Sequence, residues 1–348
     1  MKIVYSGTKY HHGTPEYGYT FEYLNFYETL KNMPNIELIY FPYDQEKEIG
    51  TKRLNEELVE LIKKEKPDLY FAHMPNVQIS TLTLDEIKKY TITCGWFGDD
   101  HWIFYRASRY WAPHFDWVAT TYSPVIPEYH KIGCKNIIKT QLAVNVQYFK
   151  PTDSSIFNNS YDVSFVGGGY PARLKLVKKI MKAGIKVHAW GDNWPQGLIE
   201  EKKIPALFSQ SKINLDINPP ASDWGLKSLA LIFFRRKNNL IRPDFGNIYN
   251  NIRQWLGSRI SVLKVRTFEA MACGGFVIAS DSEDLRDYYL PGKEIITYDN
   301  TEDLIDKIKY YLNHDNERKA IARAGYERTL RDHTFEKRFS AIFKAIGL

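Results

Sequence analysis

Residues 263–278, with the sequence LKVRTFEAMACGGFVI, constrain the fold most because three local signals follow one another there without a gap. Residues 266–271 favour a helix, residues 273–275 supply small side chains and a helix end, and residues 276–279 form an apolar run typical of a buried strand. A helix that leads through a glycine turn into a buried strand is characteristic of a parallel sheet covered by helices. The segment therefore predicts an α/β fold.

The same alternation of strand and helix runs through the chain in two blocks. A polar, turn-rich stretch at residues 145–160 separates the blocks and is interpreted as a linker. Because 348 residues exceed the usual size of one compact core, we predict two Rossmann-like domains, residues 1–150 and residues 151–332, with a last helix within residues 333–348. Apolar strand patterns occur at residues 2–6, 36–41, 69–72, 92–97, 117–121, 137–140, 163–166, 186–190 and 212–217.

Two cations and a carboxylate mark a candidate anion site in the second block. Lys264 and Arg266 stand at the predicted start of a helix, where free backbone N–H groups and the helix dipole favour negative charge. Glu269 follows Arg266 by three residues, so the two side chains can share one helix face. We predict that a phosphate binds beside the cations and that Glu269 accepts hydrogen bonds from sugar hydroxyls.

A glycine turn in the same block predicts a second part of this site. The sequence GGG follows the predicted strand at residues 163–166 and precedes a helix, so the N–H groups of Gly168 and Gly169 can cradle a diphosphate. Arg173 falls in the first turn of that helix and adds a positive charge. The loop GDNWPQG, residues 191–197, follows the next strand and contains Trp194, which either stacks on a nucleobase or belongs to a plain turn.

Acid and base candidates lie in the first block, in loops that follow predicted strands. Ligands of parallel sheets gather beyond the carboxyl ends of the strands. The first loop contains His12, whose side chain titrates near neutral pH, and a later loop contains Asp100 between the apolar runs CGWF and HWIF. Asp100 fits two roles equally, a structural cap or an acid or base, and His12 fits either a solvated loop or a base.

The second block also resembles a known family. Residues LKVRTFEAMACGGFVIASD, GKEIITYDNTEDLIDKIKYYL and RDHTFEKR, which fall between Leu263 and Arg338, resemble the C-terminal module of CgeB-like (spore maturation type) glycosyltransferases of the GT-B class. Related retaining enzymes carry two glutamates eight positions apart, and the position eight before Glu269 is Ser261. The first glutamate is therefore absent, and both an inverting and a retaining reaction stay open.

The resemblance implies a GT-B fold in which two Rossmann-like domains face an interdomain cleft. The donor, a nucleoside diphosphate sugar of the UDP or dTDP type, would bind the second domain, with Glu269 on the ribose. A carbohydrate or other hydroxyl acceptor would bind the first, and the last helix would pack back onto that domain. An inverting enzyme would need Asp100 or His12 as the base. The alternatives are a noncatalytic nucleotide-sugar-binding protein of the same fold and a nucleotide-sugar epimerase.

Composition sets further bounds. Three cysteines at no metal-like spacing predict neither a disulfide framework nor a zinc site, and adjacent Asp99 and Asp100 alone are weak metal evidence. We therefore expect no metal and no cofactor. The chain has neither an evident leader nor a membrane-spanning run, so a cytoplasmic location is expected. Residues 229–242 combine an apolar run with basic residues and either pack inward or rest on the inner membrane face; nucleic acid is not an expected partner.

Overall fold

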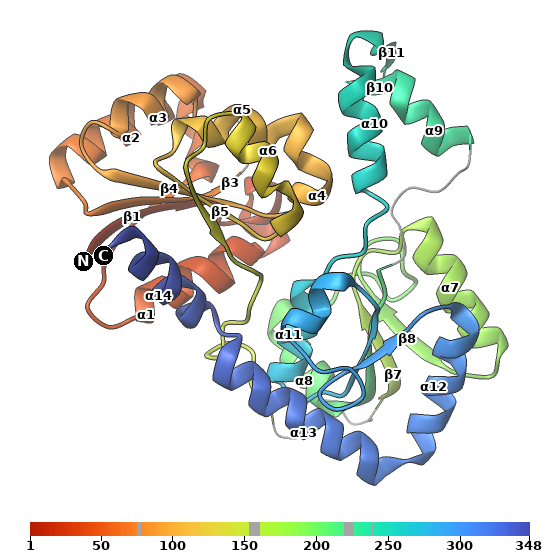
Figure 1. Ribbon diagram of the computed structural model, residues 1–348. Coiled ribbons are helices and arrows are strands. Elements are labelled where there is room, and N and C mark those ends of the chain that lie inside the picture. Colours follow the sequence, from red (N-terminus) through yellow and green to blue (C-terminus); the bar gives the residue numbers. More distant parts are fainter. Residues whose placement is uncertain (75–77, 153–160, 219–225, 238–239) are drawn as a thin grey trace. The chain divides into compact units, whose positions relative to one another are not determined.

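The computed structural model describes residues 1–74, 78–152, 161–218, 226–237 and 240–348 (Figure 1). The chain divides into two compact units. Unit 1 consists of Met1–Gln141, Ser222–Ser258 and Phe335–Leu348, and unit 2 consists of Leu142–Ala221 and Arg259–Thr334. Each unit is built on a parallel sheet with helices packed against it, which confirms the predicted α/β class.

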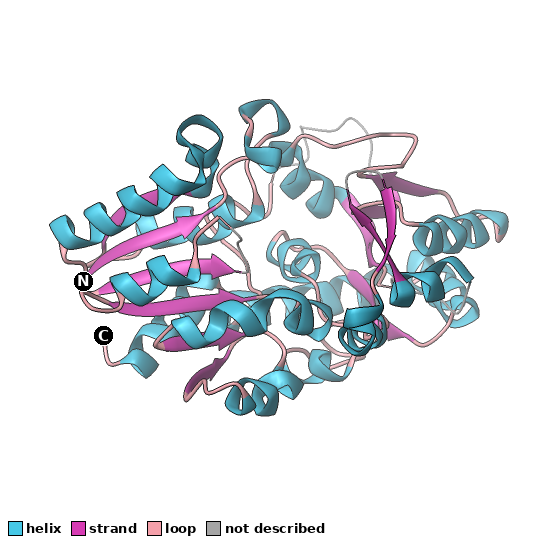
Figure 2. Cartoon of the chain, turned by 90° about the horizontal axis from the view of Figure 1, so that it is seen from above, coloured by secondary structure: helices cyan, strands magenta, loops and turns pink. Residues whose placement is uncertain are grey.

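Unit 1 contains a six-stranded parallel sheet in the order β2-β1-β3-β4-β5-β6. Figure 2 shows the strands of the chain in magenta and the helices packed beside them in cyan. The chain adds β2 on one side of β1 and β3 on the other, so the strand order reverses between β1 and β3. This reversal is the place where sheets of this type bind ligands. The strands are β1 (Lys2–Gly7), β2 (Glu37–Pro42), β3 (Leu69–Met74), β4 (Ile92–Phe97), β5 (Trp117–Thr120) and β6 (Asn136–Lys139).

Helices on unit 1 follow the strands in alternation. The helix that precedes β2 begins as a π-helical segment, η3 (Glu22–Tyr27), and continues as α1 (Glu28–Asn32). A second π-helical segment, η5 (Phe104–Ser108), follows α4. The remaining helices of this part of the chain are α2 (Glu46–Glu65), α3 (Thr81–Ile87), α4 (Asp100–Ile103), α5 (Arg109–Trp111) and α6 (Ile126–Lys131).

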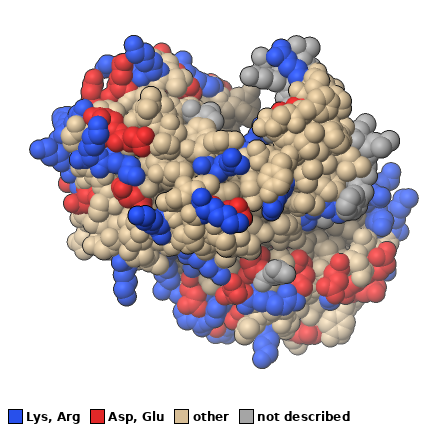
Figure 3. All heavy atoms as spheres, turned by 45° about the horizontal axis from the view of Figure 1, so that its top comes forward, with Lys and Arg blue, Asp and Glu red and all other residues tan. Residues whose placement is uncertain are grey.

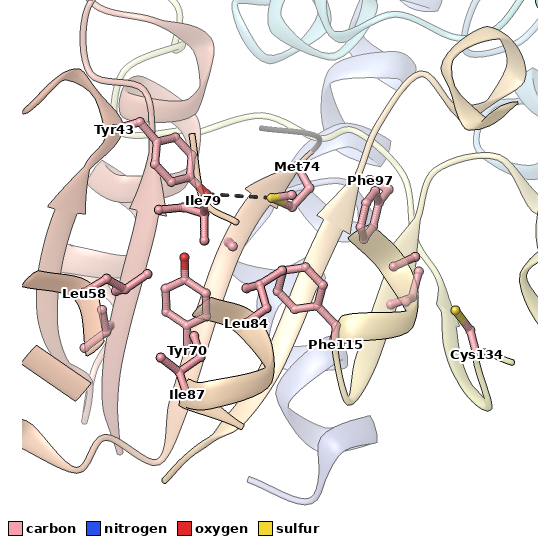
Figure 4. Close-up of a cluster of buried hydrophobic side chains, with 14 of the residues drawn as sticks. Tyr43, Leu58, Tyr70, Met74, Ile79, Leu84, Ile87, Phe97, Phe115 and Cys134 are labelled. Carbon is pink, nitrogen blue, oxygen red and sulfur yellow. Dashed lines mark hydrogen bonds between the residues drawn. The ribbon is translucent and has the colours of Figure 1, made fainter. Parts of the chain in front are cut away.

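The hydrophobic core of unit 1 fills the space between the sheet and these helices. Tyr43, Tyr70 and Phe97 are almost fully buried in it, and the hydroxyl of Tyr43 approaches the sulfur of Met74 at 3.9 Å (Figure 4). Aliphatic side chains from α2 and α3 pack against these rings. The alternation of apolar positions on the helices is therefore satisfied within the unit.

The last helix, α14 (Phe335–Ile346), belongs to unit 1 although it lies at the end of the chain. Phe335, Phe339 and Phe343 recur every four residues and so lie on one side of the helix. They contact Phe26 and Phe71, which come from η3 and β3. Three phenylalanines on one helix face supply a large apolar area, which explains why the C-terminal segment packs on this unit.

Unit 2 contains a five-stranded parallel sheet in the order β13-β12-β9-β7-β8. Here the strand order reverses between β7 and β9. The strands are β7 (Tyr161–Val166), β8 (Val187–Trp190), β9 (Ser211–Asp216), β12 (Val277–Ser280) and β13 (Ile296–Tyr298). The helices are α7 (Pro171–Lys182), α8 (Ile204–Gln210), α11 (Val265–Ala272), α12 (Thr301–Asn313) and α13 (Asp315–Asp332).

An inserted segment, residues 226–258, interrupts the alternation of unit 2 and clusters with unit 1. It consists of α9 (Leu226–Phe233), an antiparallel hairpin of β10 (Phe234–Lys237) and β11 (Leu240–Pro243), and α10 (Ile248–Gly257). α10 packs on α4 and η5, and Arg109 donates to the Asn250 side chain at 3.3 Å. The predicted domain of residues 151–332 included this segment, because nothing in its local pattern identifies the elements it contacts.

None of the helices in the described part of the chain combines the length and the apolar character needed to cross a membrane.

The close packing of α10 on α4 makes a prediction about stability. A Cβ atom on Gly257 would overlap the backbone carbonyl of His101, which cannot move like the end of a flexible side chain. We expect Gly257→Ala to lower the free energy of unfolding by about 1–3 kcal/mol, as measured by urea denaturation. Gly246→Ala is the matched control and should be close to neutral, because apart from its chain neighbours no atom of the described residues lies within 4 Å of the position that its Cβ would take. Equal stability of both variants would contradict the packing shown here.

Candidate functional site

A glycine turn joins β7 to α7 at the point where the strand order of unit 2 reverses. The N–H groups of Gly167 and Gly169 donate to the carbonyls of Trp190 and Asp192 at 2.8 and 2.7 Å, so this turn is held by the segment that follows β8. Gly191 has a φ of +134°, and a side chain there would overlap the carbonyl of Gly167. Only glycine allows the two backbones to lie this close.

Trp194 packs against the glycine turn. Its indole N–H donates to the carbonyl of Gly167 at 2.7 Å, and its ring meets Phe165 edge to face. Only 8% of Trp194 is exposed. That Trp194 stacks on a nucleobase stays a prediction. Its observed contacts hold the turn that contains Gly168 and Gly169.

Arg173 connects the two loops that flank the reversal point of the sheet. Its guanidinium donates to the carbonyl of Gly168 at 3.1 Å, to the carbonyl of Ile217 at 2.8 Å and to the side chain of Asn218 at 3.0 Å. It also lies over the ring of Phe165. Burial lowers the pKa of Arg173, and the nearby Asp216 carboxylate opposes that shift. Arg173 therefore places a positive charge between the ends of β7 and β9.

Asp216, the last residue of β9, is the centre of this region and was not singled out from the sequence. It is buried, and its carboxylate accepts hydrogen bonds from the amide of Asn218 at 2.7 Å and from the hydroxyl of Thr267. Burial raises the pKa of Asp216, while the Thr267 hydrogen bond and the charges of Arg173 and Lys264 act in the opposite direction. An acidic residue at the carboxyl end of a predicted strand is the sequence signal that could have revealed it.

The hydrogen bond from Thr267 ties the first turn of α11 to the end of β9. Lys264 is the N-cap residue of α11, and its side chain makes no capping hydrogen bond to the helix. Arg266 donates to Glu269 at 2.5 Å, so the predicted sharing of one helix face is present in the structure. The Glu269 side chain is 2% exposed and that of Arg266 35% exposed, which means that the cation covers a buried carboxylate.

These contacts bring most of the predicted residues of unit 2 together. Gly168, Gly169, Arg173 and Trp194 form one network, and Asp216 links it to the start of α11. Ser261, the position at which related retaining enzymes have a glutamate, has a buried hydroxyl without a hydrogen-bond partner among the described residues. The cluster combines positive charge, helix N-termini and carboxylates, and the first two of these favour a bound anion.

Asp100 begins α4 in unit 1 and is 2% exposed. One carboxyl oxygen accepts hydrogen bonds from the Thr120 and Tyr129 hydroxyls at 2.6 and 2.7 Å, and the other has no partner among the described residues. Burial raises the pKa of Asp100 to about 7, although the hydroxyls counteract part of that effect. A carboxyl that titrates near neutral pH can exchange a proton, but these contacts also join α4 to β5 and α6.

His12 lies in the loop that follows β1, and its surroundings differ from those of Asp100. The side chain is exposed and meets the ring of Tyr17 edge to face, while the backbone adopts a φ of +54°. Lys47 donates to the carbonyl of His12. A positive φ is uncommon for a residue with a side chain, so surrounding contacts hold this loop in a defined shape.

A row of tyrosine rings lies along η3 and the loop that follows β1. This row was not predicted from the sequence. Successive ring centroids are 4.4–5.8 Å apart, and Lys9 lies over two of the rings. Three of these tyrosines recur every four residues in the sequence, which is the signal that could have predicted a common helix face. The row consists of Tyr10, Tyr19, Tyr23, Tyr27, Tyr40 and Tyr5.

In the described part of the chain, no group of three or more His, Cys, Asp or Glu side chains is arranged to hold a metal ion. All three cysteines are buried and unpaired.

Comparisons with known proteins agree on one class. Residues 173–344 match the family described as glycosyl transferase-like. The structure resembles HepE of Anabaena, solved with UDP and glucose, with a TM-score of 0.60, 11% identity, and coverage of 100% of this chain and 99% of that one. It also resembles sucrose-phosphate synthase of Thermosynechococcus elongatus, with a TM-score of 0.57, 13% identity, and coverage of 99% and 98%. The fold is that of the GT-B glycosyltransferases.

The chain is also similar in sequence to a spore protein. It is 26% identical over 222 residues to the spore protein CgeB of Bacillus subtilis (strain 168), a match that covers 63% of this chain and 64% of CgeB. The aligned part is thus less than two thirds of that relative. The family resemblance inferred from residues 263–338 is confirmed by the glycosyl transferase-like match and by CgeB together.

The raised pKa of Asp100 predicts a pH-dependent stability. The ordinary pKa of an aspartate carboxyl is 3.8, and that of Asp100 in the folded protein is about 7. Between these two pH values the carboxyl of Asp100 is ionised in the unfolded chain and still protonated in the folded protein. The free energy of unfolding therefore falls with rising pH, by at most about 1.4 kcal/mol per pH unit from this one group. Asp100→Asn keeps the shape and removes the titration. We expect its stability relative to the native protein to increase between about pH 5 and about pH 8 in urea denaturation.

Asp162→Asn is the control, because Asp162 is exposed and forms a surface ion pair with Lys212, a kind of contact that contributes little to stability. A constant difference between the Asp100 variant and the native protein across this pH range would contradict the account of the buried carboxyl.

Proposed function

We propose that this protein is a glycosyltransferase that moves a sugar from a nucleoside diphosphate sugar to a hydroxyl group of an acceptor. The observation that carries the proposal is the cluster at the reversal point of the unit 2 sheet, where Arg173, Asp216 and the start of α11 converge. The glycosyl transferase-like match and the fold support the same conclusion. UDP is the first candidate for the nucleotide, because HepE was solved with it, and dTDP is the second.

The residues of unit 2 suit the departure of a nucleoside diphosphate. Negative charge grows on the diphosphate as the bond to the sugar breaks, and fixed cations and N–H groups stabilise that charge without a metal ion. We assign Arg173, Lys264 and Arg266 to this charge and the backbone of Gly168 to the diphosphate. The N–H of Gly169 already donates to Asp192, so its contribution is to hold the turn.

Glu269 is assigned to hydroxyls of the donor. Its carboxylate is buried against Arg266, so a ribose that approaches the start of α11 would meet an acceptor that is already oriented. Trp194, which belongs to the loop at residues 191–197, is proposed to contact the nucleobase.

We assign recognition of the acceptor to unit 1. The row of tyrosines beside His12 offers aromatic surface and hydroxyl groups, both of which suit a carbohydrate. If the reaction inverts the sugar, His12 or Asp100 takes the proton of the attacking hydroxyl. His12 is exposed and can meet an acceptor directly, whereas Asp100 would need a path to its unpartnered oxygen.

Nucleotide binding tests the donor site. We expect Arg266→Ala to weaken UDP and pyrophosphate alike by about 1.5–3 kcal/mol in titration calorimetry, the scale of a lost charge-assisted hydrogen bond. Glu269→Gln should weaken UDP but leave pyrophosphate unchanged, because its role is on the nucleoside. Arg323→Ala removes a cation of an exposed ion pair in the same unit and is the control. Native affinity for both ligands in Arg266→Ala would remove this residue from the site.

Turnover separates an enzyme from a binding protein. We expect the native protein to release UDP slowly from UDP-glucose, or from another UDP sugar, in the presence of EDTA as well as without it. His12→Ala or Asp100→Asn should reduce the rate by about 10²-fold if that group is the base, with UDP affinity unchanged.

Native rates in both variants would favour a retaining reaction. Tight UDP binding with no release from any sugar nucleotide would favour the noncatalytic alternative, and a requirement for Mn²⁺ would reopen Asp99 and Asp100 as ligands.

A further inference from the structure

The inserted segment at residues 226–258 exposes an unusual number of large apolar side chains. Ile241, Phe245 and Tyr249 are 73%, 60% and 62% exposed, although such side chains are usually buried in a protein core. Neighbouring residues of the segment extend the same surface. We refer to these residues together as the apolar face, and they are Phe233, Phe234, Ile241, Phe245, Tyr249, Ile252 and Leu256.

The apolar face follows the outer side of α10. Tyr249, Ile252 and Leu256 recur at helical spacing and are exposed, whereas Asn251 and Trp255 on the other side are 4% and 6% exposed. An amphipathic helix on a protein surface normally turns its apolar residues inward. Tyr249 is partly covered, because one edge of its ring meets Tyr105 of η5. Ile252 and Leu256 lie on the solvent side as well, and the inner contacts of α10 do not explain their exposure.

Contacts on the inner side keep α10 in this orientation. The amide of Asn251 donates to the carbonyl of Ile232 at 3.0 Å and to the Asp244 carboxylate at 3.1 Å, which ties α10 to α9 and to the residue after β11. Gly257 at the other end lies against the backbone of α4. The helix therefore cannot rotate to bury the exposed side chains without losing these contacts.

The charge of the segment identifies the kind of surface it can meet. Residues 226–258 contain six Lys or Arg residues and one acidic residue, Asp244, whereas the whole chain contains 47 basic and 41 acidic residues. Arg242 lies between Ile241 and Phe245 of the apolar face along the chain, and it is exposed. In Figure 3 the surface between the grey residues at the upper right is mainly tan, with blue atoms at its upper edge.

We propose that the apolar face docks on an anionic lipid surface. Aromatic and aliphatic side chains beside arginines are the combination that enters the boundary between lipid headgroups and acyl chains. A second copy of the chain fits less well, because a symmetric contact would bring two strongly basic segments together. Docking would bring the enzyme to acceptors or products held at a membrane, but the proposal itself does not depend on the proposed reaction.

Vesicle flotation tests the proposal with the full-length protein. We expect the protein to float with vesicles of equimolar phosphatidylcholine and phosphatidylglycerol and to remain behind with vesicles of phosphatidylcholine alone. The double variant Ile241→Ser, Phe245→Ser should reduce the vesicle-bound fraction about tenfold or more, because both side chains would lose their burial in lipid. Arg242→Glu should reduce it at least about fivefold, the effect of one cation near an anionic surface.

Matched controls use exposed residues outside the segment. Leu82 and Leu198 are 80% and 71% exposed, so Leu82→Ser, Leu198→Ser removes the same kind of surface elsewhere and should leave flotation unchanged. Lys52 is 92% exposed, and Lys52→Glu makes the same change in charge as Arg242→Glu. Unfolding midpoints and sedimentation velocity are measured for each variant.

Three results would overturn the proposal. One is the absence of flotation with anionic vesicles. Another is equal loss of flotation in the matched controls, which would indicate a general effect of charge or apolar surface. The third is concentration-dependent dimerisation that the double variant abolishes while flotation is absent, which would assign the face to a second copy of the chain.

Discussion

Burial of the Asp216 carboxylate is the constraint on which the rest of unit 2 depends. Taking a carboxylate out of water costs several kcal/mol unless hydrogen bonds and positive charge compensate it. Asn218 and Thr267 provide the hydrogen bonds, and Arg173 and Lys264 provide the charge. These partners come from separate segments, so satisfying one buried group fixes the end of β9 and the start of α11 relative to each other.

The glycine turn depends on the same arrangement. Arg173 reaches both Gly168 and the residues after β9, so the turn after β7 and the loop after β9 are held at a fixed spacing. The backbone contact with Gly191 holds the turn from the other side. An anion that binds here would meet a turn and a positive charge that are already held in place, which reduces the cost of organising the site.

Unit 1 contains a buried aspartate with a different balance of forces. Asp100 also accepts a hydrogen bond from a threonine at a strand end, but it has no cation among the causes that shift its pKa, and burial dominates. Asp216 has two cations near it. The two carboxyls therefore differ in kind, since one lies within a cluster of positive charge while the other titrates near neutral pH.

The sequence by itself determined the α/β class, the approximate positions of the strands and the Arg266–Glu269 pair, because all three follow from local spacing along one helix or strand. It also marked Gly168, Gly169 and Arg173, whose residue types are typical of a turn before a helix. Only the tertiary structure decided that Trp194 is buried against the glycine turn, that Asp216 joins β9 to α11, and that residues 226–258 pack on unit 1. Each of these depends on contacts between residues far apart in the chain, and the energy of burying a charge or an aromatic ring depends on those contacts rather than on the neighbours in sequence.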